Sequence, residues 1–522
     1  MSAFPDHLQA LLYPRAYPHP VQAVELIETH VSWVLLTGEF AYKIKRPVSY
    51  PFIDLRSPER RAFLCHEEIR LNRRFAPELY LGVCPVSYVE GEARLEGSGR
   101  VIEHAVRMRQ FPREDELEQL LEARLIEPAE LESFGRELAR IHARLPVPRP
   151  AQSWGRPPAQ RALIIDNAAE CARVGESLGT SANLRTLQAD LEVLLDKAMQ
   201  TLSARFVAGR VRECHADLHA RNIVRRDARL LAFDCLEFDP ALRWIDVADE
   251  ISFLLADLES RQKTLHAQAF LAGYLAESGD YQACVLLPLF KAHRALVRAK
   301  ITALSATEGK AGSTDKPDAR RQFEAYVEYA RRSLVPKSPI LILMSGLSGS
   351  GKTWIAQRLA PRLLGIHLRS DIERRRMAGL SGADRSDSGV EEGLYSRKVT
   401  VEVYRQLAHC AQDILAGGYP TIVDATFGRR ADRAHFHELS ARLGVKVCMV
   451  HCHAPRYVLQ ARIVERRQRK DDASEADLSV LAWQETHFEP ISAQEAFMVL
   501  EATTTEPDAV DRLVERIGAL SA

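Results

Sequence analysis

Eight residues, Gly346–Thr353, constrain this chain more than any other segment. They read Gly-Leu-Ser-Gly-Ser-Gly-Lys-Thr, which is the full pattern of a phosphate-binding loop: two glycines separated by four residues, then lysine and threonine. An apolar strand pattern, Ile340–Met344, precedes the loop, and a helical pattern, Lys352–Leu363, follows it. Because backbone N–H groups and a helix N-terminus both attract anions, this order of elements predicts a site for nucleotide phosphates.

The residues of this loop have distinct expected roles. We expect five of them to surround the phosphates of ATP with backbone N–H groups: Gly346, Ser348, Gly349, Ser350 and Gly351. Lys352 should reach the β- and γ-phosphates, and Thr353 should bind Mg²⁺. The alternative, a glycine-rich turn that binds nothing, is disfavoured by the correct strand and helix patterns on either side.

Strand and helix patterns alternate over residues 339–522. Apolar runs at Ile366–Arg369, Thr421–Val423 and Val445–His451 predict strands, and Glu391–Ala416 predicts a helix. Such alternation is typical of a parallel sheet with right-handed crossovers. We therefore predict an α/β domain here, joined to the rest of the chain by a linker at 333–338.

Two carboxylates follow strands of this predicted sheet. Asp371 comes after the second strand and Asp424 after the third. Ligands of open parallel sheets bind at the carboxyl ends of the strands, so both acids should face the phosphate loop. One acid would orient Mg²⁺ or its water, and the other would accept a proton from an attacking hydroxyl. The alternative for each is a helix N-cap.

On this loop and these two acids, the span 339–522 resembles the small P-loop kinases that include polynucleotide 5′-kinases, zeta-type toxins and gluconate kinase. The resemblance implies that Asp371 deprotonates the acceptor, which leaves Asp424 for the metal. It also implies acceptor-side arginines and an arginine-bearing lid over the transferring phosphoryl group. The candidates are Arg374, Arg375 and Arg376 for the acceptor side, and Arg462, Arg466, Arg467 and Arg469 for the lid, with Arg466 favoured. A solvated helix face is the alternative for both clusters.

A second constellation lies earlier in the chain. His215, Asp217 and Asn222 have the H-x-D-x-x-x-x-N spacing, and Asp234 follows Asp217 by 17 residues, after an apolar run. Kinases place a catalytic Asp, a metal-binding Asn and a metal-binding Asp in this order. We therefore expect Asp217 to accept the hydroxyl proton, and Asn222 and Asp234 to bind Mg²⁺.

A lysine upstream completes this pattern. Lys43 lies in the strand pattern Phe40–Ile44, which forms a predicted hairpin with Val31–Leu36. Glu68 lies in the predicted helix Ser57–Phe75 and would pair with Lys43. Lys45, on the same strand face, and Glu67 are the alternatives to Lys43 and Glu68. Further helices are predicted over Leu117–Leu125, Glu130–Leu145 and Leu184–Phe206, with a strand–loop–strand segment over Val211–Phe233.

Residues 1–332 resemble the aminoglycoside phosphotransferase and choline kinase branch of the protein-kinase-like fold. The resemblance implies an N-lobe of about 1–110 and a C-lobe of about 111–332. Ala216 stands at the glycine of the branch's His-Gly-Asp-Leu-His motif, and Asp246 resembles the buried Asp that hydrogen-bonds the catalytic loop. No G-x-G-x-x-G loop precedes Lys43. The whole chain resembles bacterial fusions of such a domain with a P-loop domain.

Composition excludes other classes of protein. The chain has 70 basic residues (Lys and Arg) and 70 acidic residues (Asp and Glu), so its net charge is zero. This balance disfavours a protein whose main role is to coat nucleic acid. The nine cysteines are scattered and form no CxxC pair, which favours a reducing cytoplasm. The first residues have no signal-peptide pattern, and no apolar run of about 18 residues predicts a membrane span.

The sequence therefore predicts a two-lobed α+β kinase-like domain followed by an α/β P-loop domain. Each would use ATP and Mg²⁺ to phosphorylate the hydroxyl of a small polar molecule in the cytoplasm. One alternative makes the P-loop domain a nucleic-acid 5′-hydroxyl kinase, which the neutral charge disfavours. Another makes the first domain a nucleotide-binding regulatory pseudokinase. The sequence names neither the acceptor nor an oligomeric state.

Overall fold

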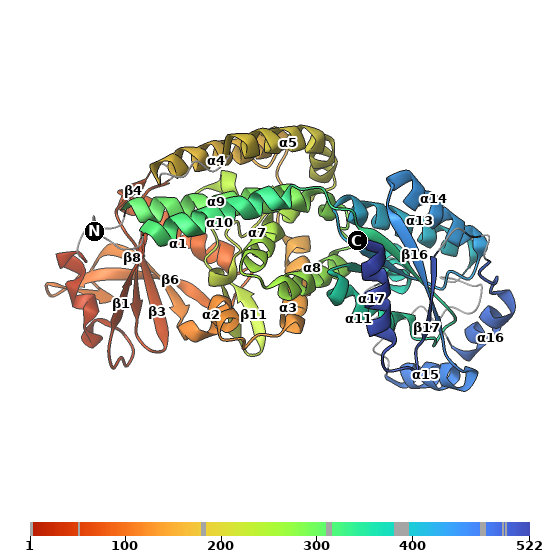
Figure 1. Cartoon of the computed structure of the whole chain (residues 1–522). Helices are drawn as coiled ribbons and strands as arrows, with labels where there is room; N and C mark the ends of the chain where they lie inside the picture. Colours follow the sequence, from red (N-terminus) through yellow and green to blue (C-terminus); the bar gives the residue numbers. More distant parts are fainter. Residues whose placement is uncertain are drawn as a thin grey trace. The chain divides into compact units, whose positions relative to one another are not determined.

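The computed structural model describes residues 4–50, 53–178, 184–308, 316–380, 396–469, 477–492, 495 and 498–521 (Figure 1). Contacts divide the chain into two compact units: Met1–Glu130 with Arg140–Arg261, and Leu131–Ala139 with Gln262–Ala522. Among the described residues, no helix has the length and apolar character that crossing a membrane requires.

An antiparallel sheet of six strands, in the order β1-β2-β3-β8-β6-β7, opens the first unit. The predicted hairpin is confirmed, because β2 (Ser32–Leu36) pairs with β3 (Phe40–Lys45) and places Val34 opposite Lys43. On the other side of β3 lies β8 (Arg100–Arg109), the strand that faces Lys43 with Val106. The remaining strands are β1 (Glu25–Glu28), β6 (Tyr80–Val89) and β7 (Glu92–Leu95).

Helix α1 (Pro58–Asn72) confirms the helix predicted over Ser57–Phe75. Ser57 caps it by accepting a hydrogen bond from the backbone N–H of Arg60, and Pro58 occupies the first turn, where no N–H is needed. The helix packs against β6 and β8, and its Glu68 is fully buried. It therefore brings a carboxylate into the interior beside β3.

Helices make up much of the chain after the sheet. The three predicted helices are present as α2 (Leu117–Glu122), α3 (Pro128–Arg144) and α5 (Leu184–Val207). The sequence patterns did not predict α4 (Pro157–Ser177), which packs along α5. Smaller elements complete the unit: η1 (Asp6–Leu12), η2 (Pro14–Ala16), β4 (Ser49–Tyr50), β5 (Ile53–Asp54), η3 (Arg113–Asp115), η4 (Ala220–Asn222), α6 (Pro240–Arg243) and α7 (Val247–Ser260).

The predicted strand–loop–strand segment over Val211–Phe233 is present, but the strands on the two sides of its loop do not pair with each other. Strand β9 (Val211–Glu213) pairs with β12 (Trp244–Asp246), while β10 (Ile223–Arg226) and β11 (Arg229–Ala232) form a separate hairpin. The strands before and after the loop thus belong to two different ladders. The loop that carries Asp217 lies between these two small sheets.

A five-stranded parallel sheet forms the centre of the second unit, as predicted. Its order is β14-β15-β13-β16-β17, and every described pairing is parallel. Its strands are β13 (Ile340–Ser345), β14 (Ile366–Arg369), β15 (Thr421–Asp424), β16 (Lys446–His453) and β17 (Met498–Thr503). Each residue of central β13 is buried, which is typical of a parallel strand covered on both faces.

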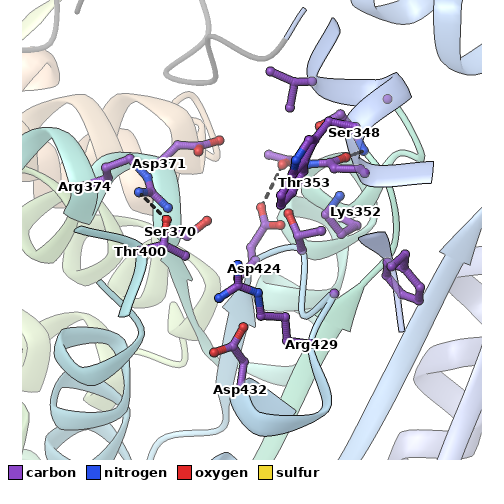
Figure 2. A pocket seen from close by; sticks show the side chains of 18 of the residues that line it. Ser348, Lys352, Thr353, Ser370, Asp371, Arg374, Thr400, Asp424, Arg429 and Asp432 are labelled. Atoms are coloured by element: carbon purple, nitrogen blue, oxygen red, sulfur yellow. Dashed lines mark hydrogen bonds between the residues drawn. The ribbon is translucent and has the colours of Figure 1, made fainter. Parts of the chain in front are cut away.

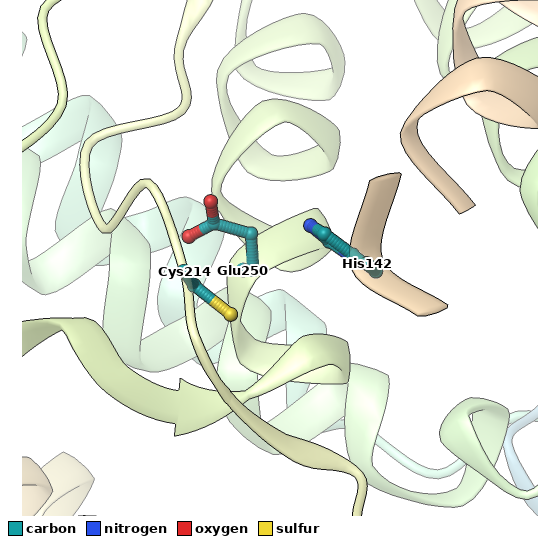
Figure 3. Close-up of side chains that lie close together, drawn as sticks. All are labelled: His142, Cys214 and Glu250. Atoms are coloured by element: carbon teal, nitrogen blue, oxygen red, sulfur yellow. The ribbon is translucent and has the colours of Figure 1, made fainter. Parts of the chain in front are cut away.

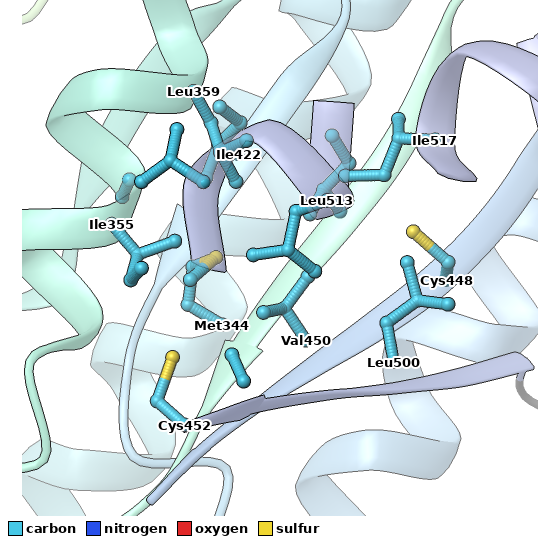
Figure 4. Close-up of a cluster of buried hydrophobic side chains, with 14 of the residues drawn as sticks. Met344, Ile355, Leu359, Ile422, Cys448, Val450, Cys452, Leu500, Leu513 and Ile517 are labelled. Carbon is cyan, nitrogen blue, oxygen red and sulfur yellow. The ribbon is translucent and has the colours of Figure 1, made fainter. Parts of the chain in front are cut away.

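Two layers of helices cover this sheet. Helices α11 (Lys352–Leu363) and α17 (Ala509–Ser521) pack on one face, where Ile355, Leu359 and Leu513 meet strand residues such as Val450 (Figure 4). Helices α13 (Arg397–Ala416) and α14 (Arg430–Leu443) contact the strands as a second layer. The predicted start of α13 at Glu391 lies outside the described residues.

Helices on both sides of the predicted linker belong to this second unit. They are α8 (Thr264–Ser278), α9 (Ala283–Glu308), α10 (Lys316–Ser333), α12 (Ser370–Met377), α15 (Arg456–Arg469) and α16 (Leu478–His487). Helix α9 packs along α10, while α8 contacts α11 and β14. Helices encoded before the linker are therefore part of the compact body that contains the parallel sheet.

Candidate functional site

The loop between β13 and α11 has the shape of a phosphate cradle. Gly346, Gly349 and Gly351 have φ angles of 137°, 80° and 90°, in the region that side chains rarely adopt. A Cβ atom on Gly346 would lie 2.3 Å from the carbonyl oxygen of Cys452. Glycine is therefore required there both for the backbone turn and for the close approach of β16.

The last two residues of the loop motif face polar partners. The Nζ atom of Lys352 donates to the carbonyl oxygens of Gly346 and Leu347, at 2.8 Å each. The hydroxyl of Thr353 donates to Asp424 Oδ2 at 2.7 Å. Burial lowers the pKa of Lys352 from its ordinary value, in opposition to the nearby Asp424 carboxylate. A phosphate entering the loop would offer Lys352 a better partner than two carbonyl groups.

Asp424 is buried but ionised. Burial acts to raise its pKa, but a 3.1 Å hydrogen bond with His367 Nε2 and the charges of His367 and Lys352 bring the pKa of Asp424 to about 2. An ionised carboxylate beside a threonine hydroxyl is a suitable pair of oxygen ligands for Mg²⁺. The hydrogen bond between His367 and Asp424 was not predicted. In β14, His367 alternates with the buried residues Ile366 and Leu368, and this alternation could have indicated the contact.

One orphaned atom supports a phosphate ligand. The Ser350 hydroxyl is buried and has no hydrogen-bond partner among the described residues. A buried polar atom without a partner costs about 1–3 kcal/mol, so such atoms require an explanation. A phosphate oxygen in the loop would supply the missing partner, which means that the loop fits the group it was predicted to bind.

Asp371 and Asp424 border the same cavity, which has a volume of about 310 Å³ (Figure 2). Figure 2 shows Asp371 and Arg374 on one side, Lys352 and Thr353 on the other, and Asp424 between them. Neither acid caps a helix: the cap of α12 is Arg369, and Asp424 bonds to side chains of α11 and β14. The alternative interpretation of both acids as N-caps is therefore wrong.

The lid candidates separate in the structure. Arg466 lines the cavity, and its charge lowers the pKa of Lys352 after the larger effect of burial. Arg462 also lines the cavity, but its guanidinium is bound to the protein: it donates to the Thr504 hydroxyl at 2.8 Å and to the Gly349 carbonyl at 3.3 Å, which fixes the back of the loop. The side chains of Arg467 and Arg469 lie outside the described part of the chain.

The acceptor-side candidates also separate. Arg374 lines the cavity and donates to the Thr400 hydroxyl at 3.3 Å. Arg376 lies away from the cavity lining and bonds to Glu373 and to the carbonyl oxygen of Ala276. Arg375 is likewise absent from the lining. Of the three, only Arg374 reaches the cavity among the described residues.

The predicted triad of the first unit is brought together by the β10–β11 hairpin, because Asn222 directly precedes it and the backbone N–H of Phe233, next to Asp234, donates to the Asn222 carbonyl. The Asn222 amide donates to Asp217 Oδ2 at 2.9 Å and to the Asp217 carbonyl at 3.0 Å. His215 Nε2 lies 2.8 Å from the carbonyl oxygen of Phe233, next to Asp234. The carboxylates remain open, since the Asp217 and Asp234 side chains are 38% and 43% exposed. Two accessible acids and an amide at one place are suited to a metal–phosphate complex.

The lysine and glutamate alternatives are resolved by distance. Lys43 Nζ lies 3.0 Å from Glu68 Oε1 and also contacts Asp234. Lys45 Nζ lies 2.7 Å from Glu68 Oε2 and contacts Glu237, with a side chain only 1% exposed. Both lysines thus meet Glu68. Lys43 alone borders the accessible Asp234, so it is the lysine that faces the candidate site.

Glu67 has a different role from Glu68. Its carboxylate accepts hydrogen bonds from Arg70 and Arg243 and makes no contact with either lysine. Glu237, by contrast, was missed. Glu237 follows Asp234 by three residues, and this short spacing is the feature of the sequence that could have indicated a place for Glu237 near the site.

Buried acids hold the Asp217 loop from behind. Glu250 accepts hydrogen bonds from the backbone N–H groups of His215 and Ala216, at 2.8 and 2.9 Å. Asp257 accepts one from the N–H of Ala220. Asp246, which the resemblance gave this role, instead pairs with Arg205 at 2.8 Å and caps α7. That expectation is wrong, and Glu250 with Asp257 take its place one and three turns further along α7.

His142, Cys214 and Glu250 form the group that most resembles a metal site among the described residues (Figure 3). They approach from α3, the Asp217 loop and α7, with ligand atoms within 4.8 Å of one another. Burial lowers the pKa of His142 to about 3 and keeps the ring neutral. However, both Glu250 oxygens already accept loop amides. Support of the loop therefore accounts for this cluster without a metal.

The two lysines provide a first test. Removing Lys45 leaves Glu237 buried without its cation, so Lys45→Met should lower the free energy of unfolding by roughly 3–5 kcal/mol. Lys43→Met should cost less, because Glu68 keeps Lys45 and Asp234 is open to water. Denaturant unfolding of both full-length variants measures the difference. A larger loss for Lys43→Met would contradict the assignment of Lys45 as the structural lysine.

Ala216 provides a second test. Its φ of 71° lies in the left-handed region, where a non-glycine residue costs about 1–2 kcal/mol. Ala216→Gly should therefore leave stability unchanged or raise it slightly, since relief of strain offsets the added freedom of the unfolded chain. The matched control Ala198→Gly, inside helix α5, should lose about 1 kcal/mol. Equal losses at the two positions would show that the strain is absent.

The comparisons with known proteins agree with this geometry. The family model described as Phosphotransferase enzyme family matches residues 51–286, and the one described as AAA domain matches residues 341–491. An uncharacterized protein of Mycobacterium tuberculosis (strain ATCC 25618 / H37Rv) is 30% identical over 468 residues, which cover 89% of this chain and 91% of the relative. An uncharacterized protein of Mycobacterium bovis gives the same values.

Solved structures match each part separately. A putative kinase from Chloroflexus aurantiacus is 25% identical over 35% of this chain and 98% of its own, with a TM-score of 0.28. A choline/ethanolamine kinase family protein from Mesorhizobium loti is 12% identical over 60% of this chain and 92% of its own, with a TM-score of 0.34. The chain belongs to the same family as the mycobacterial proteins, and it is a phosphotransferase in which a kinase-like region precedes a P-loop kinase domain.

Proposed function

We propose that the P-loop site transfers the γ-phosphoryl group of ATP to a hydroxyl group of a small polar molecule. One observation carries the proposal: Lys352, Thr353, Asp424 and Asp371 line a single cavity. The first three are suited to hold a metal-bound nucleotide. The fourth lies across the cavity from them, on the side where an acceptor would enter (Figure 2).

The cavity residues have two chemical roles: some stabilise the charge of the phosphates, and one accepts the proton of the acceptor. Lys352 and Arg466 place positive charge around the phosphates, where negative charge develops during transfer. Asp371 makes no side-chain hydrogen bond to any described residue, so its carboxylate is available to accept the acceptor's proton. Thr353 and Asp424 would hold Mg²⁺, which neutralises phosphate charge when bound.

The cavity also bears on the acceptor. Its volume of about 310 Å³ suits a small molecule. Arg374, Arg397 and Arg429 line it together with Asp371, which favours an acceptor that carries an anionic group. The same arginines are the observation that favours the second candidate, a kinase for nucleic-acid 5′-hydroxyls. Oligonucleotide binding that weakens steeply as the salt concentration rises would support that candidate. We expect no such salt-dependent binding.

We propose that the first unit is a second ATP-dependent site, with Asp217 as proton acceptor and with Asn222 and Asp234 as Mg²⁺ ligands. The Lys43–Glu68 pair supports this, because it leaves Lys43 beside Asp234 and ready to meet a phosphate. The alternative, a regulatory pseudokinase, rests on the missing glycine-rich loop before Lys43. It predicts nucleotide binding without transfer.

Substitutions at the P-loop site test the first proposal in the full-length chain. Lys352→Ala should lower phosphoryl transfer by roughly 10²–10³-fold, because it removes charge from the β/γ oxygens. Asp371→Asn should lower transfer by roughly 10²–10⁴-fold and spare nucleotide affinity. Asp424→Asn should weaken magnesium-dependent nucleotide binding.

The acceptor would be found by mass spectrometry of metabolite pools incubated with the full chain and Mg·ATP, with Lys352→Ala as the blank. Arg362→Ala, on the same helix but outside the cavity lining, is the matched control and should change nothing, because Arg362 pairs only with the exposed Asp511 among the described residues. Equal, mild effects of Asp371→Asn and Asp424→Asn would sink the assignment of these acids.

Two substitutions separate the interpretations of the first unit. Asp234→Ala should cut the affinity of that site for Mg·ATP, because it removes a metal ligand. Asp217→Asn should spare affinity and reduce turnover by roughly 10²–10⁴-fold. Calorimetry in a Lys352→Ala background isolates this site from the P-loop. Affinity for Mg·ATP with no turnover, and no effect of Asp217→Asn, would establish the pseudokinase; no binding at all would exclude both versions.

A further inference from the structure

Helix α12 carries the proposed proton acceptor, yet it is short. It has eight residues, Ser370–Met377, and Asp371 lies in its first turn. An isolated helix of this length is unstable in water, so its position must come from tertiary contacts. Asp371 and Arg374, three residues apart, share the face that borders the cavity. The opposite face carries another pair with the same spacing, Glu373 and Arg376.

Glu373 of this pair is buried, and Arg376 is half-buried, beside the end of α8 and the turn between α8 and α9. Glu373 is 1% exposed, and its Oε1 atom accepts hydrogen bonds from the Tyr281 hydroxyl at 3.0 Å and from Arg376. Arg376 also donates to the carbonyl oxygen of Ala276, the third-last residue of α8, at 2.5 Å. Burial, followed by the charge of Glu373, raises the pKa of Tyr281, so the phenol keeps its proton and donates.

The end of α8 is shaped for this contact. Gly279 caps the helix with a φ of 64°, and a Cβ atom there would lie 2.6 Å from Arg376 Nε. A side chain at this position would displace the guanidinium. Nearby, the Gln268 amide donates to the carbonyl oxygen of Gly365, directly before β14. Helix α8 and the turn between α8 and α9 therefore hold both the strand that leads to α12 and α12 itself, all within the second compact unit.

We propose that Tyr281, Glu373 and Arg376 are positioning residues that fix Asp371 and Arg374 opposite the phosphate loop. The consequence is that the P-loop site depends on helices encoded before residue 333. Tyr281 and Ala276 lie inside the segment matched by the phosphotransferase family, whereas Glu373 and Arg376 lie inside the segment matched by the AAA domain. The inference rests on the proposed role of Asp371, and its test separates the two.

The test uses the full-length chain with Asp234→Ala, so that the nucleotide signal comes from the P-loop site. Tyr281→Phe removes one hydroxyl. With water as the acceptor, it should lower the formation of ADP and inorganic phosphate from Mg·ATP roughly 10–100-fold, because small displacements of a catalytic group have effects of this size. Affinity for Mg²⁺ and a fluorescent ADP analogue should change by less than about twofold, since the nucleotide ligands are untouched. Tyr326→Phe, on α10, is the matched control and should change neither quantity.

Hydrogen exchange supplies a readout that needs no turnover. Tyr281→Phe should speed amide exchange in α12 and leave α11 unchanged, whereas a general loss of stability would speed both. Arg376→Lys keeps the charge beside Glu373 but shortens the reach to Ala276, and should give an intermediate effect. Unchanged exchange in α12 would overturn the inference.

The remaining outcomes distinguish the two proposals. If Asp371→Asn lowers ADP formation and Tyr281→Phe does not, the positioning role is wrong and the role of Asp371 stands. Another outcome is that Asp371→Asn has no effect while Tyr281→Phe slows ADP formation and speeds exchange in α12. The three positioning residues then do fix α12, but they position another group, such as Arg374. If neither affects turnover, the proposed function of this face and the inference fail together.

Discussion

The parallel register of β13, β14 and β15 is the constraint on which the P-loop site depends. Met344 pairs with Asp424, and Arg369 pairs with the same residue from the other side. The three strands therefore end at one level, and the segment after each strand enters the same space. The loop comes after β13 and α12 comes after β14, while Asp424 ends β15 itself. The Thr353–Asp424 hydrogen bond then joins the first strand's helix to the third strand.

The kinase-like site also brings catalytic groups from different segments to one place, but it does so without a parallel sheet. Asp217 stands on the loop between β9 and β10, and Asp234 follows β11, so the acids depend on two small antiparallel ladders that cannot by themselves fix the backbone of the loop. Buried carboxylates on α7 do so, since Glu250 and Asp257 accept loop N–H groups that no strand partner satisfies. The backbone is left-handed at Ala216 in this loop and again at Asp234, directly after the β10–β11 hairpin. Strained residues at a site persist only where the surroundings hold them in this way.

Local patterns were sufficient to predict much of this architecture. The Gly346–Thr353 loop, the hairpin that carries Lys43 and the parallel order of the sheet all depend on spacings within a few residues, or on alternation of elements. Such signals are present in the sequence because they reflect backbone geometry. These local signals were enough to predict that Asp371 and Asp424 border one cavity, whereas the pairing of Lys43 with Glu68 followed from the kinase order of motifs.

Partners that are distant in sequence were not predictable in the same way. Tyr281 and Glu373 carry no spacing that relates them, and neither do Lys45 and Glu237. The resemblance named Asp246 as the acid behind the loop, but a buried arginine, Arg205, claims that carboxylate in this chain. Which buried acid meets a backbone amide depends on how α5 and α7 pack, and no local pattern records that.

The two sides of the P-loop cavity differ in the interactions that hold their helices in place. Lys352 and Thr353 stand on a twelve-residue helix packed on the sheet, so nucleotide binding rests on the core. Asp371 stands on an eight-residue helix held by buried polar contacts. A hydrogen-bonded contact of this kind can be broken by a local movement of α12 while the apolar core of the sheet stays packed. Control of transfer without control of nucleotide binding would therefore act through α12, which contacts α13, the end of α8 and the turn between α8 and α9.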